Sequence, residues 1–74
     1  MRTNGSVHIK DYTVVFCEGD EINAQTRCAR FEVQGRIYDA IGSSVSNSFS
    51  DILQLGILLR GNVDVPEGEV TILK

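Results

Sequence analysis

The chain has 74 residues, a formal net charge of −3 and no tryptophan. This length holds one domain, and a single core of that size supplies only about 3–5 kcal/mol of stability unaided. The acidic balance excludes a dedicated DNA-binding protein, and the longest apolar stretch, 52–59, is far short of the ~20 residues that a membrane span needs. We predict a single cytoplasmic domain over 1–74, flexible at 1–6, that binds neither nucleic acid nor membrane.

The first predicted element is a strand over residues 7–17. Valine, isoleucine, tyrosine, threonine and phenylalanine dominate it, and these residues suit a pleated, half-buried surface. The apolar residues change parity between Ile9 and Tyr12. We therefore expect a β-bulge or a break near Lys10-Asp11, followed by a polar turn at 18–21.

A second strand is predicted from residue 24 onward, because apolar and polar residues alternate as far as residue 34. It continues either as one long strand kinked at Gly35 or as a hairpin with Gln34-Gly35 as its loop. We slightly favour the long strand, which keeps Ile37 on the apolar face with Phe31. The hairpin would instead form three cross-strand pairs: Val33–Arg36, Phe31–Tyr38 and Arg30–Asp39.

The apolar run at 52–59 is predicted to be a helix. Ser48 and Asp51 resemble a capping box before it, while Arg60 and Gly61 suit its last turn and C-cap. Gly56 weakens the prediction by about 1 kcal/mol relative to alanine. The run also shows strand-like alternation, but the caps and the leucine content favour the helix. The residues that alternate are Leu53, Leu55, Ile57 and Leu59.

The pattern permits a short strand from Val63 that ends at Pro66, since proline suits an edge or a turn. After a turn at 67–68, a final strand is expected at 70–73. The predicted fold class is therefore α+β. It consists of a small antiparallel sheet of three to four strands and one short helix. The expected order is strand, strand, an optional third strand, helix, strand.

The predicted helix is apolar nearly all round, which is more than one thin sheet can cover. We therefore predict that part of it is buried against a second copy of the chain. The residues predicted for this oligomer interface are Ile52, Leu55, Gly56, Ile57, Leu58 and Leu59.

The serine-rich segment before the predicted helix suggests a ligand site. Backbone N–H groups at a helix N-terminus bind anions, and serine hydroxyls add donors. The chain has neither a Walker pattern nor a dinucleotide fingerprint. A phosphorylated metabolite or nucleotide would be held by Gly42, Ser43, Ser44 and Ser46, with positive charge from Arg30, Arg36 or Arg60.

We predict no cofactor, no metal site and no catalytic residues. Cys17 and Cys28 form no CxxC motif, and His8 is the only histidine. A disulfide is not expected in a reducing compartment. Our first hypothesis is a non-enzymatic binding protein that forms a homo-oligomer through the helix or a sheet edge and inhibits or sequesters another protein, as small phage- or mobile-element-encoded proteins do. The second is the phosphorylated-ligand binder.

Overall fold

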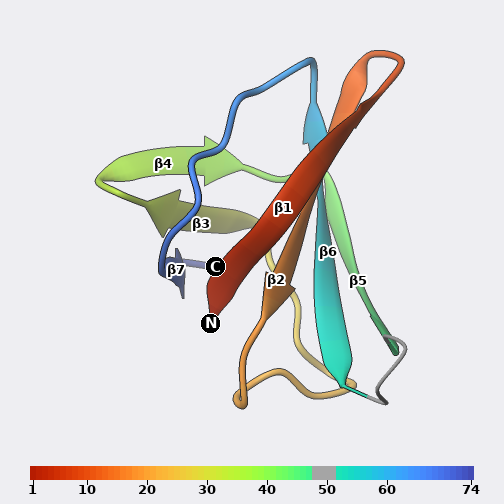
Figure 1. The fold of residues 1–74 in the computed structure, drawn as a ribbon, viewed down its shortest axis with the longest axis vertical. Coiled ribbons are helices and arrows are strands. Elements are labelled where there is room, and N and C mark those ends of the chain that lie inside the picture. The colour runs from red at the N-terminus through yellow and green to blue at the C-terminus, as the bar shows by residue number, and fades with distance from the viewer. Residues whose placement is uncertain (48–51) are drawn as a thin grey trace.

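The computed structural model describes residues 1–47 and 52–74, which form seven strands in two antiparallel sheets (Figure 1). The large sheet has the order β1-β2-β6-β5, and the small sheet has the order β4-β3-β7. The strands are β1 (Arg2–Ile9), β2 (Tyr12–Glu18), β3 (Arg30–Val33), β4 (Arg36–Asp39), β5 (Gly42–Asn47), β6 (Leu53–Arg60) and β7 (Val70–Ile72).

The predicted helix and the α+β class are wrong: the described residues contain no helix, and 53–60 is strand β6. All of β2 pairs with this strand, from Tyr12↔Arg60 to Glu18↔Gln54. Pairing and burial in the tertiary structure override the helix propensity of leucine, which is a weak preference. Gly61 does have a positive φ of 86°, but it ends a strand. The proposed N-terminal cap lies outside the described residues.

The favoured long strand at Gly35 is also wrong, and the hairpin alternative is confirmed. Gln34 and Gly35 both have positive φ, 50° and 80°, as expected for the two-residue loop of a tight hairpin. The three expected cross-strand pairs form. The rings of Phe31 and Tyr38 stack with centroids 5.2 Å apart, and Arg30 Nε lies 2.9 Å from Asp39 Oδ1.

The single strand predicted over 7–17 is wrong, although the expected break near Lys10-Asp11 is confirmed. The break is a two-residue turn and not a bulge, and β2 runs back antiparallel to β1. Ile9 pairs with Tyr12 across this turn, and Lys10 has a positive φ of 54°. The irregular register of this hairpin lies nearer the N-terminus, beside Gly5. Residues 1–6, expected to be flexible, include the start of β1.

The core lies between the two sheets. Alternate residues of β2 and β6 face the small sheet, and the loop between β2 and β3 covers one end of the core. Each large apolar side chain buried here stabilises the fold by roughly 1.5–3 kcal/mol. The buried apolar residues are Val15, Cys17, Ile22, Cys28, Phe31, Val33, Leu55, Ile57, Leu59 and Val70.

Two buried threonines hold the connection between β6 and β7 against the large sheet. Thr13 Oγ1 donates a hydrogen bond to Gly61 O (2.7 Å) and accepts one from Val63 N (2.9 Å). Thr3 Oγ1 accepts a hydrogen bond from Gly68 N, and Thr3 N donates one to Gly68 O, both at 2.9 Å. The connection is therefore anchored near both of its ends.

The buried hydroxyl of Tyr38 lacks a hydrogen-bond partner among the described residues. Tyr38→Phe should therefore raise the free energy of unfolding by about 0.5–1 kcal/mol, because it removes an unsatisfied polar atom and keeps the ring. Urea unfolding measures the change. The control is Tyr12→Phe, since Tyr12 is 39% exposed and its loss of a hydroxyl should leave stability nearly unchanged. A destabilised Tyr38→Phe variant would show that this hydroxyl is bonded in solution.

Candidate binding surfaces

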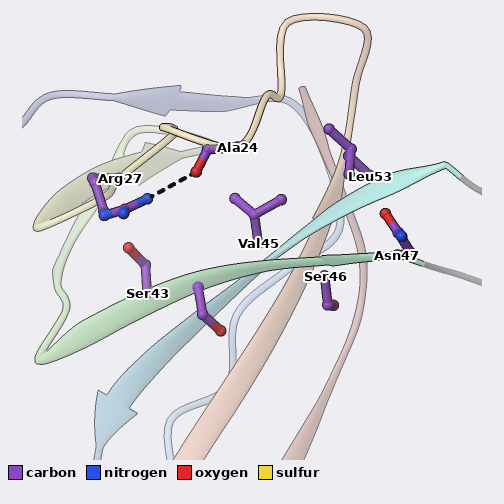
Figure 2. Close-up of a pocket in the computed structure, with 8 residues that line it drawn as sticks. Ala24, Arg27, Ser43, Val45, Ser46, Asn47 and Leu53 are labelled. Carbon is purple, nitrogen blue, oxygen red and sulfur yellow. Dashed lines mark hydrogen bonds between the residues drawn. The ribbon is translucent and has the colours of Figure 1, made fainter.

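A groove of about 530 Å³ runs beside β5 (Figure 2). We call it the β5 groove. Its lining includes five consecutive residues of that strand, whose side chains alternate between the two faces of the sheet. Because the groove contacts residues whose side chains point to either face, it must lie along the backbone edge of β5. The lining residues are Ala24, Arg27, Ser43, Ser44, Val45, Ser46, Asn47 and Leu53.

Arg27 is the charged residue of this groove. Its Nη1 donates to Ala24 O at 3.3 Å and to Thr26 O at 2.9 Å, which fixes the guanidinium against its own loop. The loop is itself ordered locally: Asn23 N donates to Thr26 Oγ1, and Gln25 N donates to Asn23 Oδ1, both at 2.8 Å. Arg27 forms no ion pair with any residue in 1–47 or 52–74.

The predicted ligand site does not assemble as expected. Its serines lie in strand β5, and the segment predicted to be the helix is strand β6. Ser43 Oγ accepts a hydrogen bond from Cys28 N (2.9 Å), whereas Ser46 points to the opposite side of β5 from Arg27 (Figure 2). Gly42 and Ser44 share the parity of Ser46. The arginines predicted for this site do not line the groove: Arg30 pairs with Asp39, Arg36 lies in β4 and Arg60 ends β6.

The sequence patterns do not assign Arg27 to the ligand site, because it lies in a loop well before the serine segment. The hydrogen bond from Cys28 N to Ser43 Oγ brings that loop onto β5. No local motif signals this contact, since it depends on the packing of the whole loop. The signal that the sequence does offer for Arg27 is that no acidic residue lies close to it in the chain to pair with it.

The second surface is the side of the large sheet that faces away from the core, which we call the outer face. It carries apolar side chains where a solvent-facing antiparallel sheet normally carries polar ones. Ile9 is 54% exposed, Val7 45% and Tyr12 39%. The apolar residues of this face are Val7, Ile9, Tyr12, Val14, Phe16 and Leu58.

A hollow of about 340 Å³ lies on the β5–β6 half of the outer face. Phe16, Val14 and Leu58 border it, and Gly42 and Gly56 contribute no side chain to fill it. A Cβ added at Gly56 would meet only atoms at ordinary van der Waals distance, 3.8 Å or more. The backbone therefore does not require glycine there, and the missing side chain leaves the hollow open.

The residues predicted for the oligomer interface divide between two environments. Leu55 and Ile57 are 0% exposed and Leu59 is 2% exposed, so all three belong to the chain's own core and are not available to another subunit. Gly56 and Leu58 lie on the outer face, and Ile52, just before β6, is 50% exposed.

The cysteines and the histidine do not form a reactive site. Cys17 and Cys28 are both free and buried. Burial, with a smaller contribution from Cys28, raises the pKa of the Cys17 thiol to about 11, and burial also raises the pKa of Cys28. Both thiols are therefore protonated at neutral pH and poorly nucleophilic. His8 Nε2 lies 3.1 Å from Val63 O. In the part of the chain that the structure describes, no three His, Cys, Asp or Glu residues gather as metal ligands.

No family model, curated protein or solved structure matches this chain. Within residues 1–47 and 52–74 there is no helix long and apolar enough to cross a membrane. The functional proposals below therefore rest on the β5 groove and the outer face.

Proposed function

We propose that this protein is a non-enzymatic, cytoplasmic binding protein that forms a homo-oligomer through its outer face and acts by sequestering or inhibiting a partner protein. The observation that supports this most directly is strand β2, which carries apolar side chains on both sides. Val15 and Cys17 point into the core, whereas Tyr12, Val14 and Phe16 point outward. A strand apolar on both sides is typical of a sheet covered on both sides.

The outer face has the character of an interface. Its apolar side chains are neighbours: Val7 pairs with Val14 and Val14 with Leu58 across three adjacent strands. Contiguous apolar surface of this kind marks sites of protein association. The hollow beside Phe16 leaves room for a partner side chain.

The charges at the rim also fit self-association. Arg60 lies at one end of the β2–β6 pair and Glu18 at the other, and both point outward. A two-fold packing that reverses the strand direction would place Arg60 of each copy near Glu18 of the other. A C2 interface uses the same patch on both copies, and opposite charges at its rim favour the correct register.

The test is sedimentation equilibrium of the native chain and of two matched variants. Ile9→Asp places a carboxylate on the outer face, and Ile37→Asp places one on β4, where the isoleucine is similarly exposed (60% against 54%). We expect Ile9→Asp to weaken self-association at least about tenfold, which corresponds to about 1.4 kcal/mol, and Ile37→Asp to leave it unchanged. A native chain that is strictly monomeric at tens of micromolar, or equal effects of the two variants, would overturn the proposal.

A further inference from the structure

We propose that the open edge of β5 binds an extended peptide as an additional strand, with a carboxylate of that peptide paired to Arg27. This site adjoins the outer face, because Ser43, Ser44 and Ser46 line both the β5 groove and the hollow, but it does not depend on self-association. Three observations support it: the position of the β5 groove, the composition of the edge strand and the charge of Arg27, which forms no ion pair with the residues that the structure describes.

The β5 groove gives a peptide access to the backbone of β5. This strand is the last one of the large sheet, with β6 on its other side. Its six residues extend over about 20 Å, since an antiparallel strand rises ~3.4 Å per residue. Alternate N–H and C=O groups of an edge strand point away from the sheet, and an added strand satisfies them.

The composition of β5 lacks the features that usually protect an edge. Proteins discourage pairing at sheet edges with charged residues, prolines, bulges or very short strands. Residues 42–47 contain no charge and no proline. The edge strands of the small sheet are better protected: β7 has three residues, and β4 has four, among them Arg36 and Asp39.

The edge of the large sheet opposite β5 is partly occupied already. Thr3 N donates to Gly68 O at 2.9 Å, and Val70 N donates to Met1 O at 2.8 Å. The start of β1 therefore bonds to the segment that leads into β7. Among the described edge strands, β5 is the long one that has no charged residue and whose edge is not hydrogen-bonded to another segment of backbone.

Arg27 gives the groove a preference for a peptide that carries a carboxylate. Its Nη1 is engaged by two carbonyl groups of its own loop, so Nε and Nη2 remain on the side of the guanidinium that binds a carboxylate with two parallel hydrogen bonds. Among the described residues, the others that line the groove are uncharged. The groove therefore carries one positive charge in a chain whose net charge is −3.

A peptide fits this groove better than a small anion does. A phosphate site needs several donors that converge on one point, but Ser46 points away from Arg27 and Ser43 Oγ already accepts the Cys28 N–H. An added strand would use the backbone of β5 as well as Arg27. Val45 and Leu53, which also line the groove, offer an apolar surface to a neighbouring peptide side chain.

The experiment is a selection of random peptides of about eight residues, long enough to match β5, displayed and captured on the immobilised chain. The selected peptides are then titrated into ¹⁵N-labelled protein. We expect them to share an aspartate or glutamate among β-branched residues and to shift the amide signals of residues 43–47. Arg27→Gln should weaken their binding at least about tenfold, whereas Arg36→Gln, an exposed arginine outside the groove, should not.

Proline substitutions at Ser44 and Val45 test the backbone contact. Successive N–H groups of an edge strand point alternately to its neighbour and to solvent, so proline is tolerated at one position and not at the next. One of the two variants should therefore stay folded and lose peptide binding while keeping Arg27. A folded variant that still binds the peptide would overturn strand addition.

Other occupants give distinct results, and each would overturn the proposal. If the amide signals of 43–47 shift with protein concentration alone, a second copy pairs with β5. If inorganic phosphate or a nucleotide shifts the Arg27 side-chain signals and displaces the selected peptides, the site takes a small anion. If no enriched peptide depends on Arg27 for binding, strand addition at β5 is overturned. The proposal of self-association through the outer face would not be affected by that result.

Discussion

Replacing Ile57 with aspartate is expected to unfold the domain. Ile57 is 0% exposed at the centre of β6, between Leu55 and Leu59 on the same face. The substitution removes a large apolar side chain and places a carboxylate where no partner can solvate it. The combined cost exceeds about 4–5 kcal/mol, which is as much as a core of this size supplies. Circular dichroism and the dispersion of amide NMR signals will report the loss of structure.

The same substitution at the next residue is the matched control. Leu58 lies on the outer face, so Leu58→Asp should cost only about 1 kcal/mol, within the span of strand preferences, and leave a folded chain. It should also weaken self-association, as expected for Ile9→Asp. If Leu58→Asp unfolds the chain and Ile57→Asp does not, the two faces of β6 have been assigned the wrong way round.

Replacing Thr13 with valine is expected to lower the free energy of unfolding by about 2–3 kcal/mol. Valine has the same shape, so the packing is kept, but Gly61 O and Val63 N each lose a hydrogen-bond partner. A buried group left unsatisfied costs about 1–3 kcal/mol, and partial access of water to this connection reduces the sum. Urea unfolding measures the loss of stability.

A second measurement separates this effect from a general loss of packing. Hydrogen exchange at the Val63 amide should become faster in Thr13→Val, because the group that accepts its hydrogen bond is gone. Thr13→Ser keeps the hydroxyl and should preserve this protection, at a cost of about 0.8 kcal/mol for the lost methyl group. Unchanged protection of Val63 in the valine variant would mean that Thr13 does not anchor the connection.

Local sequence patterns predicted some strands but misread the segment most important for the fold. The alternation of Leu55, Ile57 and Leu59 does describe β6 correctly. The helix was favoured because leucine prefers helices and Gly61 suits a helix C-cap, but a positive φ also suits a residue that leaves a strand. The deciding interaction is the pairing with β2, which is distant in the chain and leaves no local signal.

The preference at Gly35 failed for a different reason. The long strand was favoured because it would keep Ile37 with the other apolar residues. In the structure Ile37 is 60% exposed on β4. Apolar residues are common on protein surfaces, so the exposure of a single isoleucine is weak evidence against a hairpin. The pairing of Arg30 with Asp39 was the better guide.

The candidate sites could be predicted only in part. The serine segment was identified as a place where ligands could bind, and it does line the β5 groove. Its strand conformation and the contribution of Arg27 follow from tertiary contacts. The expectation that the apolar run at 52–59 exceeds what the sheet can cover rested on a helix, which the structure replaces with strand β6. Leu55, Ile57 and Leu59 are buried in the core and Leu53 packs against it, whereas Leu58 lies on the outer face.

The contact between the two ends of the chain has a consequence for folding kinetics. β1 bonds to residues 68–70, β2 pairs with β6, and β3 needs β7 beside it. The hairpins β1–β2, β3–β4 and β5–β6 are local, but the pairings that join them into two sheets must close long loops before they gain stability. Topologies of this kind fold slowly for their length. During synthesis, the small sheet cannot be completed until β7 has left the ribosome, so until then the nascent chain exposes the edge of β3 in addition to the open edge of β5.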